Sequence, residues 1–250
     1  RELLNFMGNH AHALVRVGEP LQLGSMIPED CSQGQGVSKI RYALNRYFIN
    51  ENRVIRGPIG KTASQTISEM MRPEGFGRHL PALADQLGEP LPEVQRKAQR
   101  YLKEIVADMR PAWIEAARMF LSFVFNKLYA GVEVRGIQTV LDASREAPLV
   151  VIPSHKSHVD YLLLSYLFYV NGLVTPSIAA GNNLNFFPLG QMFRRWGAFF
   201  LRRSFKQNPL YARVFRAYMH KLLKDGRTVE FFIEGGRSRT GKLLPPKYGL

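Results

Sequence analysis

Apolar positions recur at three- and four-residue spacing in the first half of the chain, which is the pattern of helices with one buried face. Pro92 and Pro111 are suited to the first turns of helices, and Gly131 is expected to end the second of these helices. Residues 1–60 carry only a short helical pattern, near 37–47. The spacing predicts helices over 61–71, 79–87, 92–106 and 111–128.

Beyond Gly131, short apolar runs alternate with helical patterns. Strands are predicted over 149–152, 177–180, 198–202 and 228–233, and helices over 161–170 and 209–224. This alternation implies an α/β layer with a mostly parallel sheet, preceded by a smaller helical region. We therefore expect a mainly helical N-terminal region over 1–109 and an α/β domain over 110–250 that is truncated at its C-terminal end.

Composition sets limits on what these elements can form. With 250 residues, 46% of them hydrophobic, the chain can bury a core, which excludes intrinsic disorder as its main state. Its single cysteine, Cys31, excludes an internal disulfide framework and a multi-thiolate metal site. No uninterrupted apolar run approaches the roughly eighteen residues of a transmembrane helix.

Positive charge is concentrated in the second half of the chain. The formal net charge is +14, of which +11 falls in residues 126–250, and no Asp or Glu occurs from Tyr161 to Lys224. Such a field attracts phosphates of nucleic acid, lipid headgroups or a small substrate. Aromatic side chains lie among the arginines over 186–205, a mixture that favours a membrane interface over nucleic acid. We expect a docking face there that includes Phe193 and Trp196.

The first candidate for chemistry follows the first predicted strand, where ligands gather in open α/β sheets. In the segment 153–160, Pro153 discourages continuation of the strand and the helix is expected to begin near Ser157, so His155 is expected in a turn and Asp160 in the first turn of the helix. Asp160 could then fix the imidazole tautomer and leave the other ring nitrogen as a general base. Two alternatives remain from the residues alone: a metal site of His155, His158 and Asp160, or a helix cap beside an incidental surface histidine.

Two further clusters follow predicted strands. In the segment 197–203, Arg202 and Arg203 point to opposite faces of a strand, so one of them is expected to bind a substrate phosphate and the other to have a structural or membrane-facing part. In the segment 231–239, Gly235 and Gly236 permit close backbone approach, while cations and a hydroxyl follow at Arg237, Ser238 and Arg239. The residues leave open whether Glu234 holds an arginine or binds substrate hydroxyls.

Together these three blocks resemble the glycerolipid acyltransferases, a family marked by His, four residues and Asp. The blocks are 155–160, 197–203 and 232–238, and the segments 160–166, 179–187 and 234–240 narrow the resemblance to the bacterial membrane-bound members that acylate glycerol 3-phosphate. Ser154 stands where many relatives have Asn, and Gly236 where many have Thr. A fourth family block is expected after Leu250, so part of the acyl-donor site could be missing.

The resemblance assigns roles position by position. It implies that His155 is the catalytic base and Asp160 its partner, and that Gly197 shapes the second block. It also implies a set of residues that hold glycerol 3-phosphate: Arg203, Glu234, Gly235, Arg237 and Ser238. Arg202 is retained beside Arg203 as a candidate substrate ligand, and no metal or organic cofactor is expected.

The activity that the resemblance implies is transfer of a fatty acyl group from acyl-CoA or acyl-carrier-protein to the sn-1 hydroxyl of glycerol 3-phosphate, the first step of phospholipid synthesis. Its expected partners are these two substrates and an anionic phospholipid surface, without nucleic acid, at the cytoplasmic face of the bacterial inner membrane. The alternatives are acylation of lysophosphatidate or dihydroxyacetone phosphate, or a non-catalytic module that binds anionic lipid or nucleic acid.

Overall fold

The structure is a computed structural model that describes residues 36, 37, 40, 61–129, 132–157, 159–202, 204–205 and 208–247. The chain divides into two compact units, Arg1–Glu51 and Asn52–Leu250, and the account below concerns the described part of the second. Several residues discussed above lie outside the described residues, as does most of the short helical pattern near 37–47; these residues are Cys31, Gly131, His158 and Arg203.

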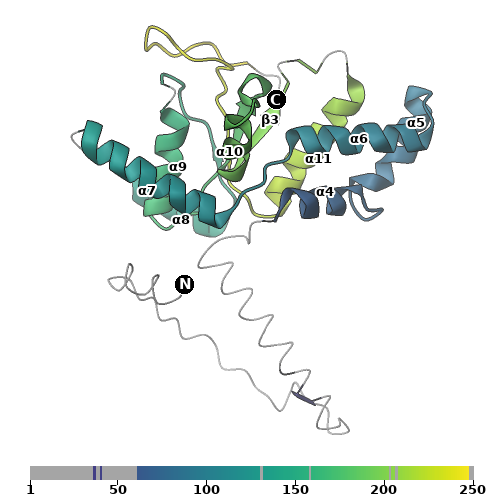
Figure 1. The fold of residues 1–250 in the computed structure, drawn as a ribbon, viewed down its shortest axis with the longest axis horizontal. Coiled ribbons are helices and arrows are strands. Elements are labelled where there is room, and N and C mark those ends of the chain that lie inside the picture. The colour runs from purple at the N-terminus through teal and green to yellow at the C-terminus, as the bar shows by residue number, and fades with distance from the viewer. Residues whose placement is uncertain are drawn as a thin grey trace. The chain divides into compact units, whose positions relative to one another are not determined.

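Helices alternate with short strands from the middle of the chain onward (Figure 1). The helices are α4 (Ala63–Met71), α5 (Leu80–Leu87), α6 (Leu91–Ile105), α7 (Pro111–Leu128), α8 (Ile137–Glu146), α9 (Asp160–Val170), α10 (Leu189–Arg195) and α11 (Pro209–Lys224), with 3₁₀ turns η1 (Phe76–His79) and η2 (Asn182–Leu184). The strands are β1 (Val150–Val151), β2 (Ser177–Gly181), β3 (Ala198–Leu201) and β4 (Val229–Glu230).

The strands form one sheet in the order β1-β4-β2-β3, and each described pairing is parallel. Val150 pairs with Val229 across the first pairing, and Ser177 pairs with Val229 on the other side of β4. The carboxyl ends of all four strands therefore lie at the same edge of the sheet, where the turns that follow β1 and β4 come together.

The predicted α/β fold with a parallel sheet is confirmed. The predicted strands all exist, but β1 and β4 are shorter than their apolar runs. Two helices were not predicted: α8, whose sequence is mostly polar, and α10, which has seven residues and contains Gly190. The helix expected over 79–87 is α5, which begins one residue later at Leu80 because His79 ends the preceding turn η1.

One buried core joins the N-terminal helices to the sheet. Val94, Ala98 and Leu102 on α6 are fully buried in the same cluster as Phe199 of β3 and Val229 of β4. In Figure 1, α4, α5, α6 and α11 lie to the right of β3 and α10, and α7, α8 and α9 lie to the left. The sheet thus shares its core with helices before residue 109, and the expected boundary at 109/110 stays a prediction.

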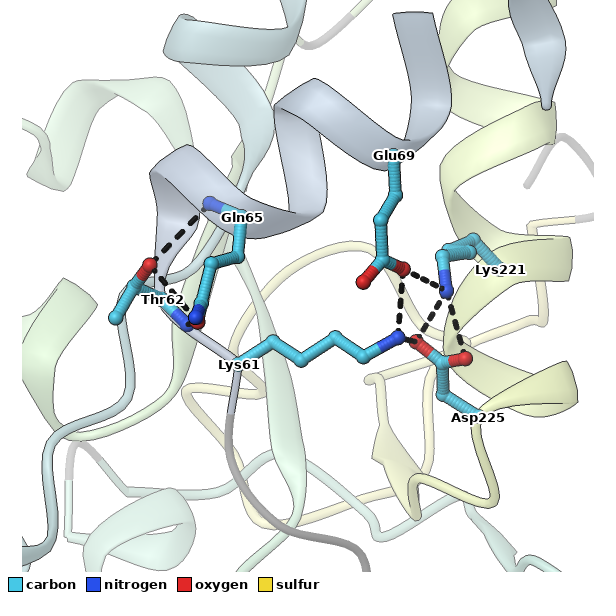
Figure 2. Close-up of polar contacts among 6 residues, drawn as sticks. All are labelled: Lys61, Thr62, Gln65, Glu69, Lys221 and Asp225. Atoms are coloured by element: carbon cyan, nitrogen blue, oxygen red, sulfur yellow. Dashed lines mark hydrogen bonds and ion pairs between the residues drawn. The ribbon is translucent and has the colours of Figure 1, made fainter. Parts of the chain in front are cut away.

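Helix α4 is fixed to the end of α11 by a polar network. A capping box starts α4: the Gln65 backbone N–H donates to Thr62 Oγ1 at 3.2 Å, and the Thr62 N–H donates to Gln65 Oε1 at 2.9 Å. Further along, Glu69 accepts from Lys61 and Lys221, and Lys221 also binds Asp225 (Figure 2). Figure 2 shows these charged groups converging between the two helices.

Candidate active site

The turn between β1 and α9 holds His155 and Asp160 in the arrangement that the sequence predicts. Asp160 is the first residue of α9, where a negative charge is favoured by the helix dipole. Its Oδ2 atom accepts the backbone N–H groups of Lys156 and Ser157 at 2.7 and 2.6 Å, and lies 3.4 Å from Nδ1 of His155. The carboxylate is thereby fixed on the side of the ring that faces α9.

His155 is not an incidental surface residue, since only 15% of its side chain is exposed. The imidazole packs against Phe232 with ring centroids 4.3 Å apart. Its backbone is held on both sides: the N–H donates to Glu234 Oε1 at 3.1 Å, and the carbonyl accepts from the Ser238 N–H at 2.8 Å. Nor does Asp160 cap α9, because the N-cap position is Val159, which makes no side-chain capping bond.

Glu234 joins the His155 turn to the chain beyond β4. The residue is 4% exposed, and its second carboxylate oxygen accepts the backbone N–H of Leu244 at 3.1 Å. Both oxygens therefore bind backbone amides of two separate segments. The sequence left open whether Glu234 holds an arginine; among the described residues its carboxylate holds backbone N–H groups instead. We call this arrangement the Glu234 clamp.

The glycine turn after β4 brings backbone and cations beside His155. Gly235 has φ +61°, a conformation that disfavours larger residues, and the place of its missing Cβ lies 2.8 Å from the Lys247 side chain. Arg237 is exposed, whereas Ser238 is 3% exposed with a hydroxyl that has no hydrogen-bond partner among the described residues. Sequence reasoning missed Lys247, which returns to the turn because its N–H donates to the Ile233 carbonyl at 2.8 Å.

The second block is placed differently from the other two. The Arg202 guanidinium binds Glu104 of α6 with two hydrogen bonds of 2.8 and 2.7 Å and lies over the rings of Tyr101 and Tyr211. Gly197 lies at the opposite end of β3 from this edge, where a Cβ would meet Met109 at 2.4 Å. Gly197 thus shapes the entry to β3, and Arg202 ties β3 to α6. Arg203 lies outside the described residues.

A cavity of about 950 Å³ opens beside these groups. His155, Gly235, Gly236, Arg237 and Lys247 contribute to its polar part, and Arg202 also lines it. The remaining wall is mostly apolar and comes from α7, α9, β2 and α10; it includes Ile114, Leu121, Leu162, Tyr166, Ile178 and Phe193. A single space thus combines a titratable ring, a cationic turn and an extended apolar wall.

The expected docking face over 186–205 is mostly turned inward. Phe193 and Trp196 are half-buried and line the cavity, and Phe199 and Phe200 are fully buried. The exposed aromatics of this segment are at its start, where Phe187 is 81% exposed. The expected docking role of Phe193 and Trp196 is therefore corrected, because α10 and its C-cap place these two rings against the cavity wall.

Sequence reasoning also missed Glu230, the last residue of β4. The side chain is completely buried, and neither carboxylate oxygen has a hydrogen-bond partner among the described residues. Burial, with a smaller contribution from the negative charge of Asp160, raises the pKa of Glu230 to about 8. The available signal was an acidic residue inside a predicted buried strand.

Two further observations concern metal ligands and membrane-spanning helices. Within the part of the chain that the structure describes, no three His, Cys, Asp or Glu side chains gather as metal ligands would, and His158 is not in that part. None of the helices in the described ranges combines the length and apolar character needed to cross a membrane.

Comparisons with known proteins agree with this α/β architecture. Residues 131–250, which contain the His155 turn and the glycine turn, match the model of the Acyltransferase family.

Over most of its length the chain is similar to proteins named glycerol-3-phosphate acyltransferase. It is 40% identical over 237 residues to the protein from Haemophilus influenzae (strain PittEE), and 38% identical over 249 residues to that from Shewanella woodyi. The match from Aeromonas hydrophila is 40% identical over 238 residues. These alignments cover 94%, 99% and 95% of this chain, but only 29%, 31% and 30% of the relatives. The chain thus spans about a third of their length.

Proposed function

We propose that this chain carries the catalytic domain of an enzyme that transfers a fatty acyl group from acyl-CoA or acyl-carrier-protein to the sn-1 hydroxyl of glycerol 3-phosphate. The observation that supports this most directly is the position of His155. Its Nδ1 atom lies 3.4 Å from Asp160, and the residue lines a cavity that has a cationic turn and an apolar wall. The names of the similar bacterial proteins favour the same acceptor.

In the proposed reaction His155 acts as a general base. Because Nδ1 faces Asp160, Nε2 is the nitrogen that takes the proton from the acceptor hydroxyl as its oxygen attacks the thioester carbonyl. The carbon–sulfur bond then breaks, and the departing thiolate receives that proton. Asp160 stabilises the intermediate imidazolium and is itself held ready by the N–H groups of Lys156 and Ser157. No acyl-enzyme forms, since the acceptor itself is the nucleophile.

The glycine turn is the proposed site of the acceptor's phosphate. Arg237 and Lys247 supply positive charge on the cavity wall, Gly235 allows close approach of the backbone, and the Ser238 hydroxyl lies unpartnered nearby. Arg203 joins this set through the family resemblance. Arg202 acts through its ion pair with Glu104, which fixes the end of β3 beside the cavity, and Gly197 shapes the start of that strand.

The apolar wall is the proposed site of the acyl chain. Side chains of α7, α9 and β2 line it without interruption by charge except at Arg118, which is ion-paired with Glu115 at 2.6 Å. Burial of a long acyl chain against such a wall contributes about 0.8 kcal/mol per methylene. The cavity therefore suits a long-chain donor whose thioester reaches His155.

An anionic membrane surface is the proposed partner, at the cytoplasmic face of the inner membrane. Exposed aromatic side chains favour this: Phe120 and Phe123 on α7 are 59% and 66% exposed, and Phe187 is exposed as well. Aromatic side chains and basic charge together suit the interface between headgroups and acyl chains. The docking residues proposed from the structure are thus on α7 and at Phe187, rather than Phe193 and Trp196.

The test replaces the two members of the dyad in the protein that contains this chain. His155→Ala is expected to lower acyl transfer to glycerol 3-phosphate by at least ~10²-fold, the usual contribution of a general base, with binding to anionic vesicles unchanged. Asp160→Asn is expected to lower it in the same direction. Lys103→Ala, an exposed position on α6 away from the cavity, is the control and keeps full activity.

The rival functions give different results in this experiment. Full activity in His155→Ala would overturn the proposed base. A non-catalytic module that binds lipid or nucleic acid would show no acyl transfer in the wild-type protein or in His155→Ala. Acceptor competition decides between glycerol 3-phosphate and the other acceptors. If lysophosphatidate or dihydroxyacetone phosphate is acylated in preference, the proposed acceptor is wrong while the base remains.

A further inference from the structure

A second cavity, of about 860 Å³, lies on the other side of the sheet. One wall is the segment from the end of α4 through η1 to α5, and the other is the outer face of α11. The two cavities share no lining residue. We call this space the α4–α11 cavity, and nothing in the proposed acyl transfer uses it.

Positive side chains dominate the α4–α11 cavity. Six Lys and Arg line it against three carboxylates, and two histidines lie among them. The six are Arg72 and Arg78 from the segment before α5, and Arg213, Arg216, Lys221 and Lys224 from α11. Helix α11 contributes no acidic side chain of its own, because its sequence from Pro209 to Lys224 contains none.

Two of the three carboxylates are already occupied. Glu69 accepts from Lys221 at 2.8 Å and from Lys61 at 2.6 Å, and Asp225 lies 2.6 Å from Lys221 (Figure 2). Hydrogen bonds from Lys221 and then Lys61 hold the pKa of Glu69 below its ordinary value. Glu69 and Asp225 therefore balance the two lysines, and Glu74 is the one lining carboxylate that remains beside the five other lining cations.

The remaining cations form a row without carboxylate partners. Arg213, Arg216 and Lys224 are exposed on one face of α11 at spacings of three and eight residues, and Arg72 and Arg78 face them across the cavity. No salt bridge to any of these five is found within the described ranges. Like charges at such spacing on a helix repel one another, and a bound anion removes that penalty.

The length of this row along α11 limits the size of the anion that can contact all of it. Arg213 and Lys224 are eleven residues apart on α11, which is about 16 Å along the helix, so a single phosphate cannot contact the whole row. The concave wall also contains Phe76 and Leu83, which can cover an organic group. We propose that the α4–α11 cavity binds a soluble small molecule that carries two or more phosphate groups.

Titration calorimetry of the protein that contains this chain, with inorganic tripolyphosphate as the probe, tests the proposal. Arg213→Gln/Arg216→Gln is expected to weaken tripolyphosphate binding at least ~10-fold, because it removes two groups that can make charge-assisted hydrogen bonds to phosphate. Orthophosphate, with a single phosphate, is expected to bind more weakly than tripolyphosphate. Arg100→Gln/Lys103→Gln removes two exposed charges from α6 outside the cavity and is the matched control.

A third variant separates this cavity from the candidate active site. Arg237→Gln/Lys247→Gln removes the cations beside His155 and is expected to leave tripolyphosphate binding unchanged. The proposal is overturned if this variant or the α6 control loses as much affinity as Arg213→Gln/Arg216→Gln, or if the wild-type protein does not bind the probe.

Vesicles distinguish a soluble ligand from a lipid headgroup. If phosphatidylglycerol vesicles bind through Arg213 and Arg216 while tripolyphosphate does not compete, the cavity recognises a membrane and the proposal is wrong. All substituted positions on α11 are exposed, so the variants are expected to fold, which circular dichroism checks. Should the double variant unfold, Lys224→Gln tests the same row and carries the same expectation.

Discussion

Glu230 is an ionisable side chain that the fold removes completely from water. It lies in the central part of the sheet, between β1 and β2, with both carboxylate oxygens buried and without a hydrogen-bond partner among the described residues. Removing an ionised carboxylate from water without a partner is so unfavourable that the group retains its proton instead. The folded protein therefore holds a neutral carboxylic acid beside the dyad at neutral pH.

Glu230 should make stability fall as pH rises. Between pH 4.5, its ordinary pKa, and about 8, its pKa in the fold, the unfolded chain releases a proton that the folded chain keeps. The free energy of unfolding then decreases by up to about 1.4 kcal/mol per pH unit in this window and levels off above it. In Glu230→Gln this contribution disappears, so the variant gains stability relative to wild type from pH 5 to pH 8.

Denaturant unfolding at several pH values measures this difference. Glu133→Gln, which removes an exposed carboxylate, is the control and is expected to keep the wild-type dependence on pH. A Glu230→Gln protein whose stability follows the wild-type curve in parallel across the window would show that Glu230 is ionised in the fold.

At the scale of elements, α7 presents an apolar surface to solvent. Met119, Phe120 and Phe123 are each more than half exposed, although other residues of the same helix, such as Leu121 and Phe125, are buried. A helix with apolar residues on both sides can bury one side in the protein and the other in a membrane. For the proposed enzyme, that membrane is the one that receives its product.

Phe120→Ser/Phe123→Ser is expected to weaken binding to phosphatidylglycerol vesicles at least ~10-fold, because burying one aromatic side chain contributes about 1.5–3 kcal/mol. Vesicle co-sedimentation of the protein that contains this chain measures the change. Leu223→Ser, an exposed apolar position on α11, is the control and should bind as wild type does. Equal binding by the α7 variant would exclude this helix as the docking element.

Elements whose signal is local could be predicted from the sequence. The apolar runs before His155 and Glu234 are strands, and the periodic segments 92–106 and 111–128 are helices within a residue or two. Helix α10 could not be predicted, since it is short and is held by distant contacts: the Arg194 side chain donates to the backbone carbonyls of Val106 and Glu104. Its sequence alone, with Gly190 near the start, favours a turn.

Within the candidate site, local contacts could be predicted from the sequence, whereas contacts between distant segments could not. The approach of Asp160 to His155 follows from a separation of five positions and a nearby proline, so the local pattern was sufficient. The partners of Arg202 and Glu234 lie 98 and 79 residues away in sequence, and no spacing rule connects such pairs. Lys247 likewise reaches the cavity through a backbone hydrogen bond to Ile233 that its side chain does not signal.

For the whole molecule, the proposal that a single cavity binds both substrates has a kinetic consequence. The proposed acceptor site at the glycine turn and the proposed acyl site along the apolar wall meet at His155, so the donor and the acceptor must be bound together before transfer. Initial rates measured at varied concentrations of both substrates are expected to give intersecting double-reciprocal lines.

Isotope exchange provides the control for this prediction. Labelled CoA incubated with acyl-CoA and enzyme, in the absence of acceptor, should not enter the acyl-CoA pool. Parallel lines together with such exchange would reveal a covalent acyl-enzyme and would contradict direct attack by the acceptor hydroxyl.

The Glu234 clamp has a consequence for attempts to redesign acceptor choice. One carboxylate fixes the backbone at His155 and at Leu244, and the adjoining turn supplies the groups proposed to grip the acceptor. Reshaping that turn to admit a bulkier alcohol would also displace the imidazole. A change in acceptor selectivity would therefore also change the turnover rate. Library designs that keep Glu234 and vary only the side chains of Arg237 and Lys247 on the cavity wall avoid this linkage.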